Sequence, residues 1–164
     1  MDTIMEVLTA AKSKNVSGLK DLSLIIFTDG TILYVGSVNA LGAKASLIHP
    51  VDLGLTFISS TLDLARMKES LEAVKGKKID PKTIVREVSD SYTIPYEKVK
   101  SIKIKKPWIP GVGKAKLTVR TKDGATYEYI LWLPKARAET GKTYRNIIKS
   151  FTRIPKLKPL VGGS

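Results

Sequence analysis

Positively charged side chains alternate with apolar ones along the stretch from Lys98 to Lys122. The stretch contains nine Lys or Arg residues and no acidic residue. Cations that no carboxylate neutralises are typical of surfaces that bind polyanions such as phosphate groups. The stretch therefore predicts anion binding as the chemistry of this part of the chain.

Strand periodicity predicts which side chains form this surface. In a half-buried strand, alternate residues point to the core and the others to solvent. Ile102 and Ile104 would face the core in one strand, and Leu117 and Val119 in the next. The cations predicted to share the opposite face are Lys103, Lys105, Lys116, Arg120 and Lys122. If the two strands are neighbours, these like charges repel each other, so the fold either spreads the repulsion through solvent or uses the charge.

A loop rich in Pro and Gly, KKPWIPGVGK, joins the two strands and adds two kinds of candidate. Lys106 and Lys114 extend the predicted anion-binding set. Trp108 could stack on a nucleic-acid base or lie at the level of lipid headgroups. The alternative is that Trp108 folds back and covers the end of the barrel, since tryptophan is on average well buried.

Charge is distributed unevenly over the chain. Residues 1–95 contain 11 basic and 11 acidic residues, whereas residues 96–164 contain 17 basic and 4 acidic residues. The formal net charge of +13 therefore lies entirely in the last 69 residues. Lysine also protects sheet edges from aggregation and is abundant in thermostable proteins, but there Glu is expected to rise with Lys. The segregation favours a binding surface over general solubility.

No residue pattern predicts catalysis. The stretch ARAETGKT, residues 136–143, loosely matches a phosphate-binding P-loop, but it has one glycine and no acidic residue follows Glu139 to hold Mg²⁺. His49 is the only histidine and cysteine is absent, so neither a metal cluster nor a nucleophile triad at a G-x-S-x-G turn is indicated. Asp29 and Asp123 are explained as turn residues. We therefore expect a protein that is not an enzyme and uses no cofactor or metal.

The N-terminal part is predicted to combine a helix, a hairpin and a helical insertion. Residues 2–14 have apolar side chains at helical spacing. Asp29-Gly30 separates two β-rich runs and predicts a hairpin, because both residues tolerate positive φ. We expect helices in the insertion at about 43–90, one ending at Gly76 and a second starting at Asp80-Pro81.

The C-terminal part is predicted to contain strands, one long helix and a tail. Asp123-Gly124 indicates the tip of a second hairpin. The segment from Lys135 to Phe151 reads as a helix with Tyr144, Ile147 and Ile148 on its apolar face. Residues 153–164 are basic, contain two prolines and end in Gly-Gly-Ser, which predicts a flexible tail.

Composition limits the class of protein. The 164 residues are 43% apolar, which suits a folded chain with a core. The absence of cysteine excludes a disulfide framework and suits a reducing compartment. We expect no secretory signal and no membrane span, because the most apolar long stretch, residues 47–65, contains a proline, a histidine and two aspartates. The expected location is cytoplasmic, with peripheral attachment to the inner face of the membrane as one option.

Two longer patterns resemble a known family. SYTIPYEKVKSIKIKK followed by KLTVRTKDGATYEYILWL and a terminal helix resembles the second half of small prokaryotic pleckstrin-homology-like (PH-like, GRAM-like) domains. In those domains an I-P-Y-x-x-(I/V)-x-S-(I/V) element opens a strand, and here it spans residues 94–102. The hairpin LIIFTDGTILYVG resembles the hairpin of the family's first sheet. The likeness covers about two-thirds of the chain.

The resemblance implies an α+β fold. Its expected form is a bent, partly open antiparallel β-barrel of about seven strands, capped by a C-terminal helix. The helical insertion at about 43–90 would separate the two β halves. A single domain would then span residues 1–152, with the N-terminal helix included and the tail excluded. Such domains generally bind lipid headgroups, peptides or proteins rather than catalyse reactions, but no ligand-binding residues of the family can be placed on this sequence.

These observations support three hypotheses for the partner. The leading hypothesis is an anionic membrane surface, with each cation adding about 1 kcal/mol and Trp108 as an interfacial anchor. The second hypothesis is RNA or DNA, with binding that falls steeply as salt rises. The third is an acidic protein bound through the tail or a sheet edge.

Overall fold

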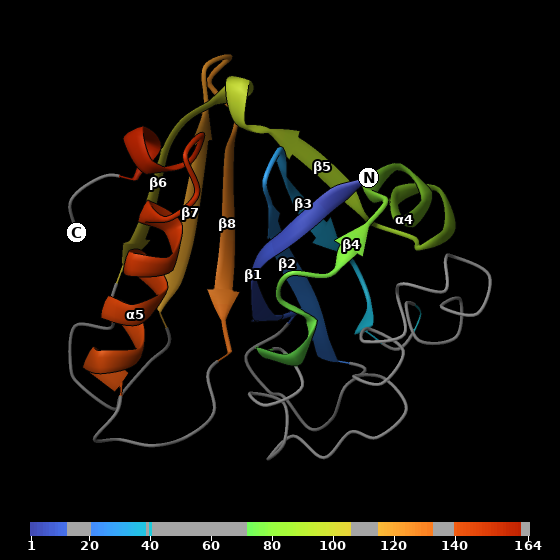
Figure 1. The fold of residues 1–164 in the computed structure, drawn as a ribbon, viewed down its shortest axis with the longest axis horizontal. Helices are drawn as coiled ribbons and strands as arrows, with labels where there is room; N and C mark the ends of the chain where they lie inside the picture. The colour runs from blue at the N-terminus through green and yellow to red at the C-terminus, as the bar shows by residue number, and fades with distance from the viewer. Residues whose placement is uncertain (13–20, 39, 41–71, 106–114, 133–139, 162–164) are drawn as a thin grey trace.

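The computed structural model describes residues 1–12, 21–38, 40, 72–105, 115–132 and 140–161 (Figure 1). These residues form an α+β structure dominated by one antiparallel sheet of eight strands. The elements in chain order are β1 (Asp2–Ala11), β2 (Leu22–Thr28), β3 (Thr31–Val35), β4 (Lys78–Ile79), α4 (Pro81–Glu87), β5 (Tyr92–Pro95), η5 (Tyr96–Lys98), β6 (Val99–Lys105), β7 (Lys116–Thr121), β8 (Thr126–Leu131), α5 (Thr140–Thr152) and η6 (Lys158–Leu160).

The sheet is strongly curved but not closed. Seven strands follow the order β5-β3-β2-β1-β8-β7-β6, and β4 pairs with β1 beside this path. β5 and β6 lie at opposite ends of the order, although only the three residues of η5 join them. The sheet must therefore bend until its two ends approach each other at η5 (Figure 1). No pairing of β5 with β6 occurs among the described residues.

A tyrosine holds the corner where the two ends of the sheet meet. Tyr96 begins η5 and is buried, and its hydroxyl donates a hydrogen bond of 2.6 Å to the backbone carbonyl of Thr28. Burial, with a contribution from the negative charge of Asp29, raises the pKa of this hydroxyl. The hydrogen bond fastens the corner to the end of β2.

The main core lies inside the bend and is covered by α5. The buried residues Tyr144, Ile147 and Phe151 place one side of α5 against it, as the apolar spacing predicted. The ring of Phe151 lies 4.5 Å from that of Phe27 on β2, centroid to centroid. The structure confirms the helix over residues 140–152, while residues 135–139 of the predicted helix lie outside the described part.

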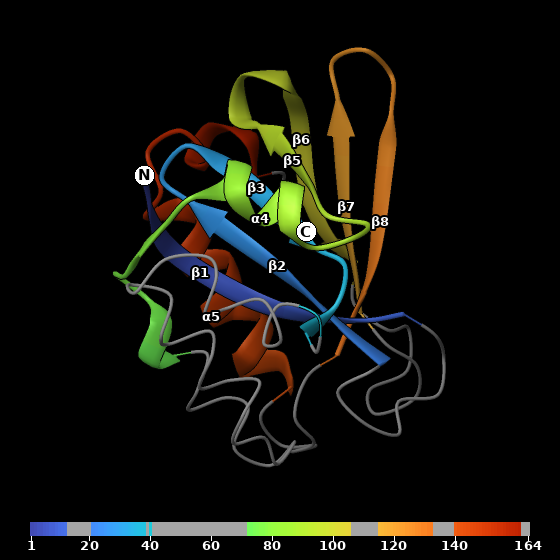
Figure 2. The same ribbon diagram turned by 90° about the vertical axis from the view of Figure 1, so that its right-hand side faces the viewer.

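A second core covers the opposite face of β1–β3. Leu24 and Ile26 of β2 belong to it, whereas Ile25 and Phe27 belong to the main core, so every residue of β2 is buried. Its cover comes from the described end of the predicted insertion, residues 72–88, including Ile84 of α4. Figure 2 shows α4 on the far side of β1–β3 from α5.

The predicted helices of the insertion are confirmed where they are described, but the prediction that the insertion separates the two β halves is wrong, because the strands that flank it, β3 and β5, pair with each other. α4 starts after Asp80, whose carboxylate accepts a hydrogen bond from the backbone N–H of Lys82, and Pro81 is its first residue. Residues 72–74 are helical and precede Gly76, which has a φ of +86°. The structure adds β4 to this segment, and residues 41–71 lie outside the described part.

The predicted N-terminal helix is wrong, because residues 2–11 form β1. β1 lies between β2 and β8 in the sheet order. Leu8 and Ala10 contact the main core, while Ile4 and Val7 contact the second core. A strand buried on both faces has no polar alternation, so its apolar residues also fit a helical template.

Both predicted hairpins are present, but the first turn differs from its expected geometry. Gly124 at the second turn has a φ of +93°, whereas neither Asp29 nor Gly30 has a positive φ. The hydroxyl oxygen of Thr28 instead accepts hydrogen bonds from the N–H groups of Gly30, at 3.1 Å, and Thr31, at 2.9 Å. These hydrogen bonds to the Thr28 side chain close the turn, so no residue of the turn needs a positive φ.

The predicted flexible tail is also wrong for residues 153–161. Ile154 and Leu157 are fully buried in the main core, and η6 packs between α5 and β6. Val161 forms a parallel bridge with Ile102 of β6, the last strand of the sheet. The prolines suggested a mobile segment, but apolar residues at a spacing of three share one side of a 3₁₀-like turn.

Candidate functional site

Alternation in β6 and β7 produces the exposed cationic surface that the sequence predicted. Ile102, Ile104, Leu117 and Val119 are buried in the main core. The cations next to them along the strands point the other way and are exposed, whereas Ser101 and Thr118 on the same side are half-buried. We call this surface the basic face, and its members are Lys103, Lys105, Lys116, Arg120 and Lys122.

The strand register determines how these cations face one another. Lys105 is directly opposite Lys116, Lys103 is opposite Thr118, and Arg120 is opposite Ser101. Directly opposed residues in an antiparallel pair have Cβ atoms about 4.5–5.5 Å apart, so the Lys105–Lys116 pair brings two like charges close together. Lys103 and Lys105 on β6 are two residues apart and therefore about 6.6–6.8 Å apart along the strand, whereas Lys116 and Arg120 on β7 are four residues apart, or about 13 Å.

A β-bulge at the start of β6 adds cations that strand alternation misses. The register shifts between Val99 and Ser101, so Lys100 is the extra residue and is exposed. Simple alternation places Lys100 on the same side as the buried Ile102. Lys98, in η5, is exposed next to it. The irregular pairing that exposes Lys100 has no signal in the sequence.

The second hairpin fixes the position of Lys122. The backbone N–H of Lys122 donates to the carbonyl of Lys98 at 2.9 Å. The Thr121 hydroxyl hydrogen-bonds to the Asp123 carboxylate and accepts from the N–H of Ala125 at 3.1 Å. The hydroxyl of Thr121 lowers the pKa of the Asp123 carboxyl, and the positive charge of Lys98 acts in the same direction. Asp123 therefore stabilises the hairpin turn.

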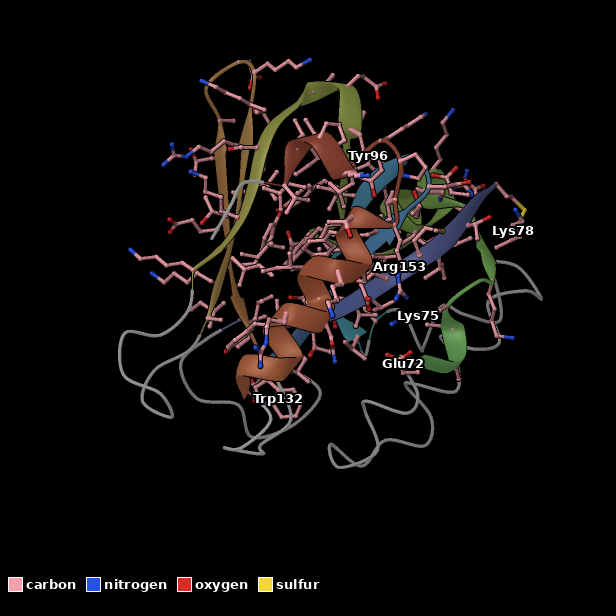
Figure 3. The ribbon with its side chains drawn as sticks, turned by 60° about the vertical axis from the view of Figure 1, so that its left-hand side comes forward. Glu72, Lys75, Lys78, Tyr96, Trp132 and Arg153 are labelled. Atoms are coloured by element: carbon pink, nitrogen blue, oxygen red, sulfur yellow. The ribbon has the colours of Figure 1, made fainter. Side chains whose placement is uncertain are left out.

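The basic face is not neutralised by ion pairs. Between described residues, the ion pairs within 4.0 Å involve only two cations, Lys75 and Arg86, and both lie elsewhere. Glu128 of β8 is the one acid on this side of β6–β8, opposite Thr118 and exposed. Side chains tipped with nitrogen extend from β6 and β7 on the side away from α5 (Figure 3).

The described part of the insertion leaves the basic face uncovered. Residues 72–88 pack on β1–β3, and β6–β8 form the other half of the sheet (Figure 2). The remaining predicted site residues, Lys106, Trp108 and Lys114, lie outside the described part. The structure thus brings together five of the eight residues that the sequence selected.

An aromatic cluster connects the two halves of the sheet. The rings of Tyr34 and Tyr92 stack with centroids 4.9 Å apart, and Tyr129 of β8 lies 5.4 Å from Tyr34. The hydroxyl oxygens of Tyr92 and Tyr129 are 2.5 Å apart, and burial raises the pKa of both groups. Because the rings contact one another, the cluster fills its own space and acts as packing.

A buried ion pair fastens the insertion to β1. Glu6 is 6% exposed, and its carboxylate lies 3.1 Å from Nζ of Lys75, which also bonds to Glu72 at 2.8 Å (Figure 3). Burial lowers the pKa of Lys75, but hydrogen bonds to Glu72 and Glu6 and the negative charges of both carboxylates together raise it further than burial lowers it. This arrangement is explained by its position between β1 and residues 72–77, which exchange backbone hydrogen bonds with Ile4.

The described residues contain no other evident chemical centre. No three acidic or histidine side chains among them converge as metal ligands. None of their helices has the length and apolar character needed to cross a bilayer. His49 and residues 133–139, which include the first half of the P-loop-like stretch, are outside the described part.

Comparisons with known proteins do not assign a family. No family model matches the chain, and no curated protein matches it. A crystal structure of the C-terminal domain of an unknown protein from Leishmania infantum is similar over 91% of this chain and 84% of that chain, with 13% sequence identity and a TM-score of 0.40. A likeness at this level carries no argument about function.

Proposed function

We propose that this chain is a non-catalytic PH-like interaction module whose basic face binds anionic lipid headgroups at a membrane surface. The observation that carries the proposal is the array of five exposed cations that β6, β7 and the following turn place on one side of the sheet. The array includes two directly opposed lysines, and no ion pair between described residues neutralises it.

Strand order supports the PH-like part of the proposal. β1, β2, β3 and β5 form a four-stranded half, and β6, β7 and β8 form a three-stranded half. The C-terminal helix α5 packs into the bend between them (Figure 1). This arrangement agrees with the bent, partly open barrel that the sequence resemblance implies, and β1 supplies the seventh strand of the path.

Energetics favour a functional use of the charge. Like charges directly opposed across strands destabilise a sheet, whereas a favourable pair contributes about 0.2–1 kcal/mol. An anionic membrane attracts each nearby Lys or Arg by about 1 kcal/mol, so five cations together gain about 5 kcal/mol in the bound state. The gain on binding is larger than the cost of holding the opposed lysines together in the free protein.

The composition of the basic face favours headgroups over nucleic-acid bases. Proteins that bind single strands combine cations with aromatic side chains on which bases stack. The described residues on this side of β6–β8 are Lys, Arg, Ser, Thr, Glu and Ile, and the aromatic side chain that follows β8, Trp132, is partly buried and packs against the second core. A surface with charge alone recognises a polyanionic layer without reading a sequence.

Vesicle sedimentation tests the proposal. Wild-type protein is mixed with vesicles of phosphatidylserine and phosphatidylcholine, or of phosphatidylcholine alone, at 50 and 150 mM salt. The test variant is K103E/K105E/R120E. The control variant is K12E/K77E/K82E, which makes the same change in net charge at exposed residues on other elements. Neutralising three contacts already removes about 3 kcal/mol, so the test variant should bind anionic vesicles at least roughly 100-fold more weakly.

The outcomes separate the proposed partner from its alternatives. The control variant should retain most of the binding, and equal loss in both variants would show that only net charge matters. Reversing all five cations together should abolish binding while the fold is kept. A duplex oligonucleotide provides the competing case, since five phosphate contacts give a slope of about −4.5 in log K against log salt. Tight oligonucleotide binding at 150 mM salt without vesicle binding would replace lipid by nucleic acid as the partner.

A further inference from the structure

The exposed side of α5 carries a second row of cations. Arg145, Lys149 and Arg153 follow one another at intervals of four residues and are exposed. They lie opposite the side that buries Tyr144 and Phe151 in the main core. Four residues of helix rise about 6 Å, so the three cations are spaced by about 6 Å along α5 and just beyond its end.

The ordered tail continues this row past the end of α5. Because Ile154 and Leu157 are fully buried, the intervening segment is held against the protein. Lys156 and Lys158 are exposed on this held segment. We call the set the helix–tail row, and its members are Arg145, Lys149, Arg153, Lys156 and Lys158. Figure 3 labels Arg153 at the junction of α5 and the tail.

Requirements of the fold explain only part of the row. Residues 140–161 include no acidic residue, and no ion pair between described residues involves a member of the row. Cations in the last turn of a helix interact favourably with its dipole, which accounts for Lys149 and Arg153. Arg145 lies too near the helix start to gain from this effect, and the tail lysines lie beyond the helix.

The row and the basic face point in different directions. α5 packs on the inner side of β6–β8, where Leu117 and Val119 contact the main core, and the basic face is on the outer side. Figure 1 shows α5 lying along one side of β6–β8. A flat bilayer that contacts the basic face therefore leaves the helix–tail row free, so a ligand of the row would be a separate one.

We propose that the helix–tail row binds an extended acidic segment of a partner protein. Carboxylates on alternate residues of an extended chain recur about every 6.6–6.8 Å, close to the spacing of about 6 Å between Arg145, Lys149 and Arg153. Arg145 and Arg153 add guanidinium groups, which bind carboxylates through two parallel hydrogen bonds. The large apolar side chains exposed in the described part, Met1 and Val85, lie on other elements, so the row offers no platform for stacking bases. This second surface goes beyond the proposed lipid binding and does not depend on it.

A synthetic peptide of alternating Glu and Ser residues tests the second surface, since self-repulsion keeps such a chain extended. Fluorescence anisotropy of the labelled peptide is measured at 50 and 150 mM salt with the full chain. The row variant is R145E/K149E/R153E, and the matched control is K103E/K105E/R120E, which makes the same charge change on the basic face. The row variant should bind at least 10-fold more weakly than wild type, and the control should stay within twofold.

Three results would overturn the inference. They are no binding of the peptide by wild type at 50 mM salt, equal losses in the two variants, or tighter binding of a uridine homopolymer that the row variant abolishes. Circular dichroism melts check the fold, and R145Q/K149Q/R153Q replaces the row variant if reversal of charge unfolds it. In the vesicle assay the row variant should sediment like wild type, so failure of this inference is distinguishable from failure of the lipid proposal.

Discussion

The opposed lysines of the basic face predict that one substitution strengthens the fold and weakens binding. In K105E, a carboxylate replaces Lys105 directly opposite Lys116, so a repulsive cross-strand pair becomes an attractive one. In K103E, the same charge change occurs opposite Thr118, where no cation is directly opposed. The two variants differ in cross-strand partner while sharing strand, exposure and residue type.

The register sets the expected magnitudes. Removal of the repulsion and gain of an attraction each contribute about 0.2–1 kcal/mol, so K105E should raise the free energy of unfolding by about 0.4–2 kcal/mol relative to K103E. For a chain of this length this corresponds to a melting temperature higher by about 1–8 °C. Loss of one cation and gain of one anion should weaken vesicle binding by about 1–2 kcal/mol, or roughly 5- to 30-fold, in both variants.

Thermal and urea unfolding measure the first effect, and vesicle sedimentation measures the second. A double-mutant cycle with K105E, K116E and K105E/K116E isolates the coupling, because the double variant restores a like-charge pair. The stabilisation should shrink in 1 M salt, where charges are screened beyond about 3 Å. If K105E is no more stable than K103E, or if the cycle shows no coupling at low salt, Lys105 and Lys116 do not repel each other measurably.

Three further predictions concern the parts of the fold that the sequence misjudged or could not reveal. Leu157→Ala in the tail should lower the free energy of unfolding by about 2–5 kcal/mol, because truncation of a fully buried side chain leaves a cavity. If the variant unfolds in urea like wild type, the tail does not stabilise the fold. Gly36→Ala should cost about 1–3 kcal/mol, since its Cβ would lie 2.4 Å from the backbone carbonyl oxygen of Ser89, and unchanged thermal stability would contradict that close approach. The pKa of Lys75 is raised in the folded state, so its stabilising pairing with Glu6 is complete below the unfolded pKa near 10.5 and is lost as pH rises through the folded value. Wild type should therefore lose more stability than Lys75→Met between pH 9 and 12 in urea titrations, and parallel losses would refute the assignment.

The sequence alone determined the elements that bury one face and expose the other. β6 and β7 alternate apolar and polar side chains, and α5 carries its apolar residues at helical spacing. In both cases the local pattern itself indicates which side of the strand or helix faces the core. The five cations of the basic face followed from that alternation and from the concentration of charge in the last 69 residues.

Tertiary structure decided the features that depend on distant partners. β1 has apolar residues on both sides because it lies between two cores, so its periodicity could not distinguish a strand from a helix. The tail is ordered because Ile154 and Leu157 find a place between α5 and β6. The exposure of Lys100 depends on a bulge in the pairing of β6 with β7. Residues 72–88 lie on β1–β3 and leave the basic face open on that side, and this position depends on contacts between segments far apart in the sequence. Each of these features depends on contacts with residues that are distant in the sequence, and a local sequence pattern cannot indicate such contacts.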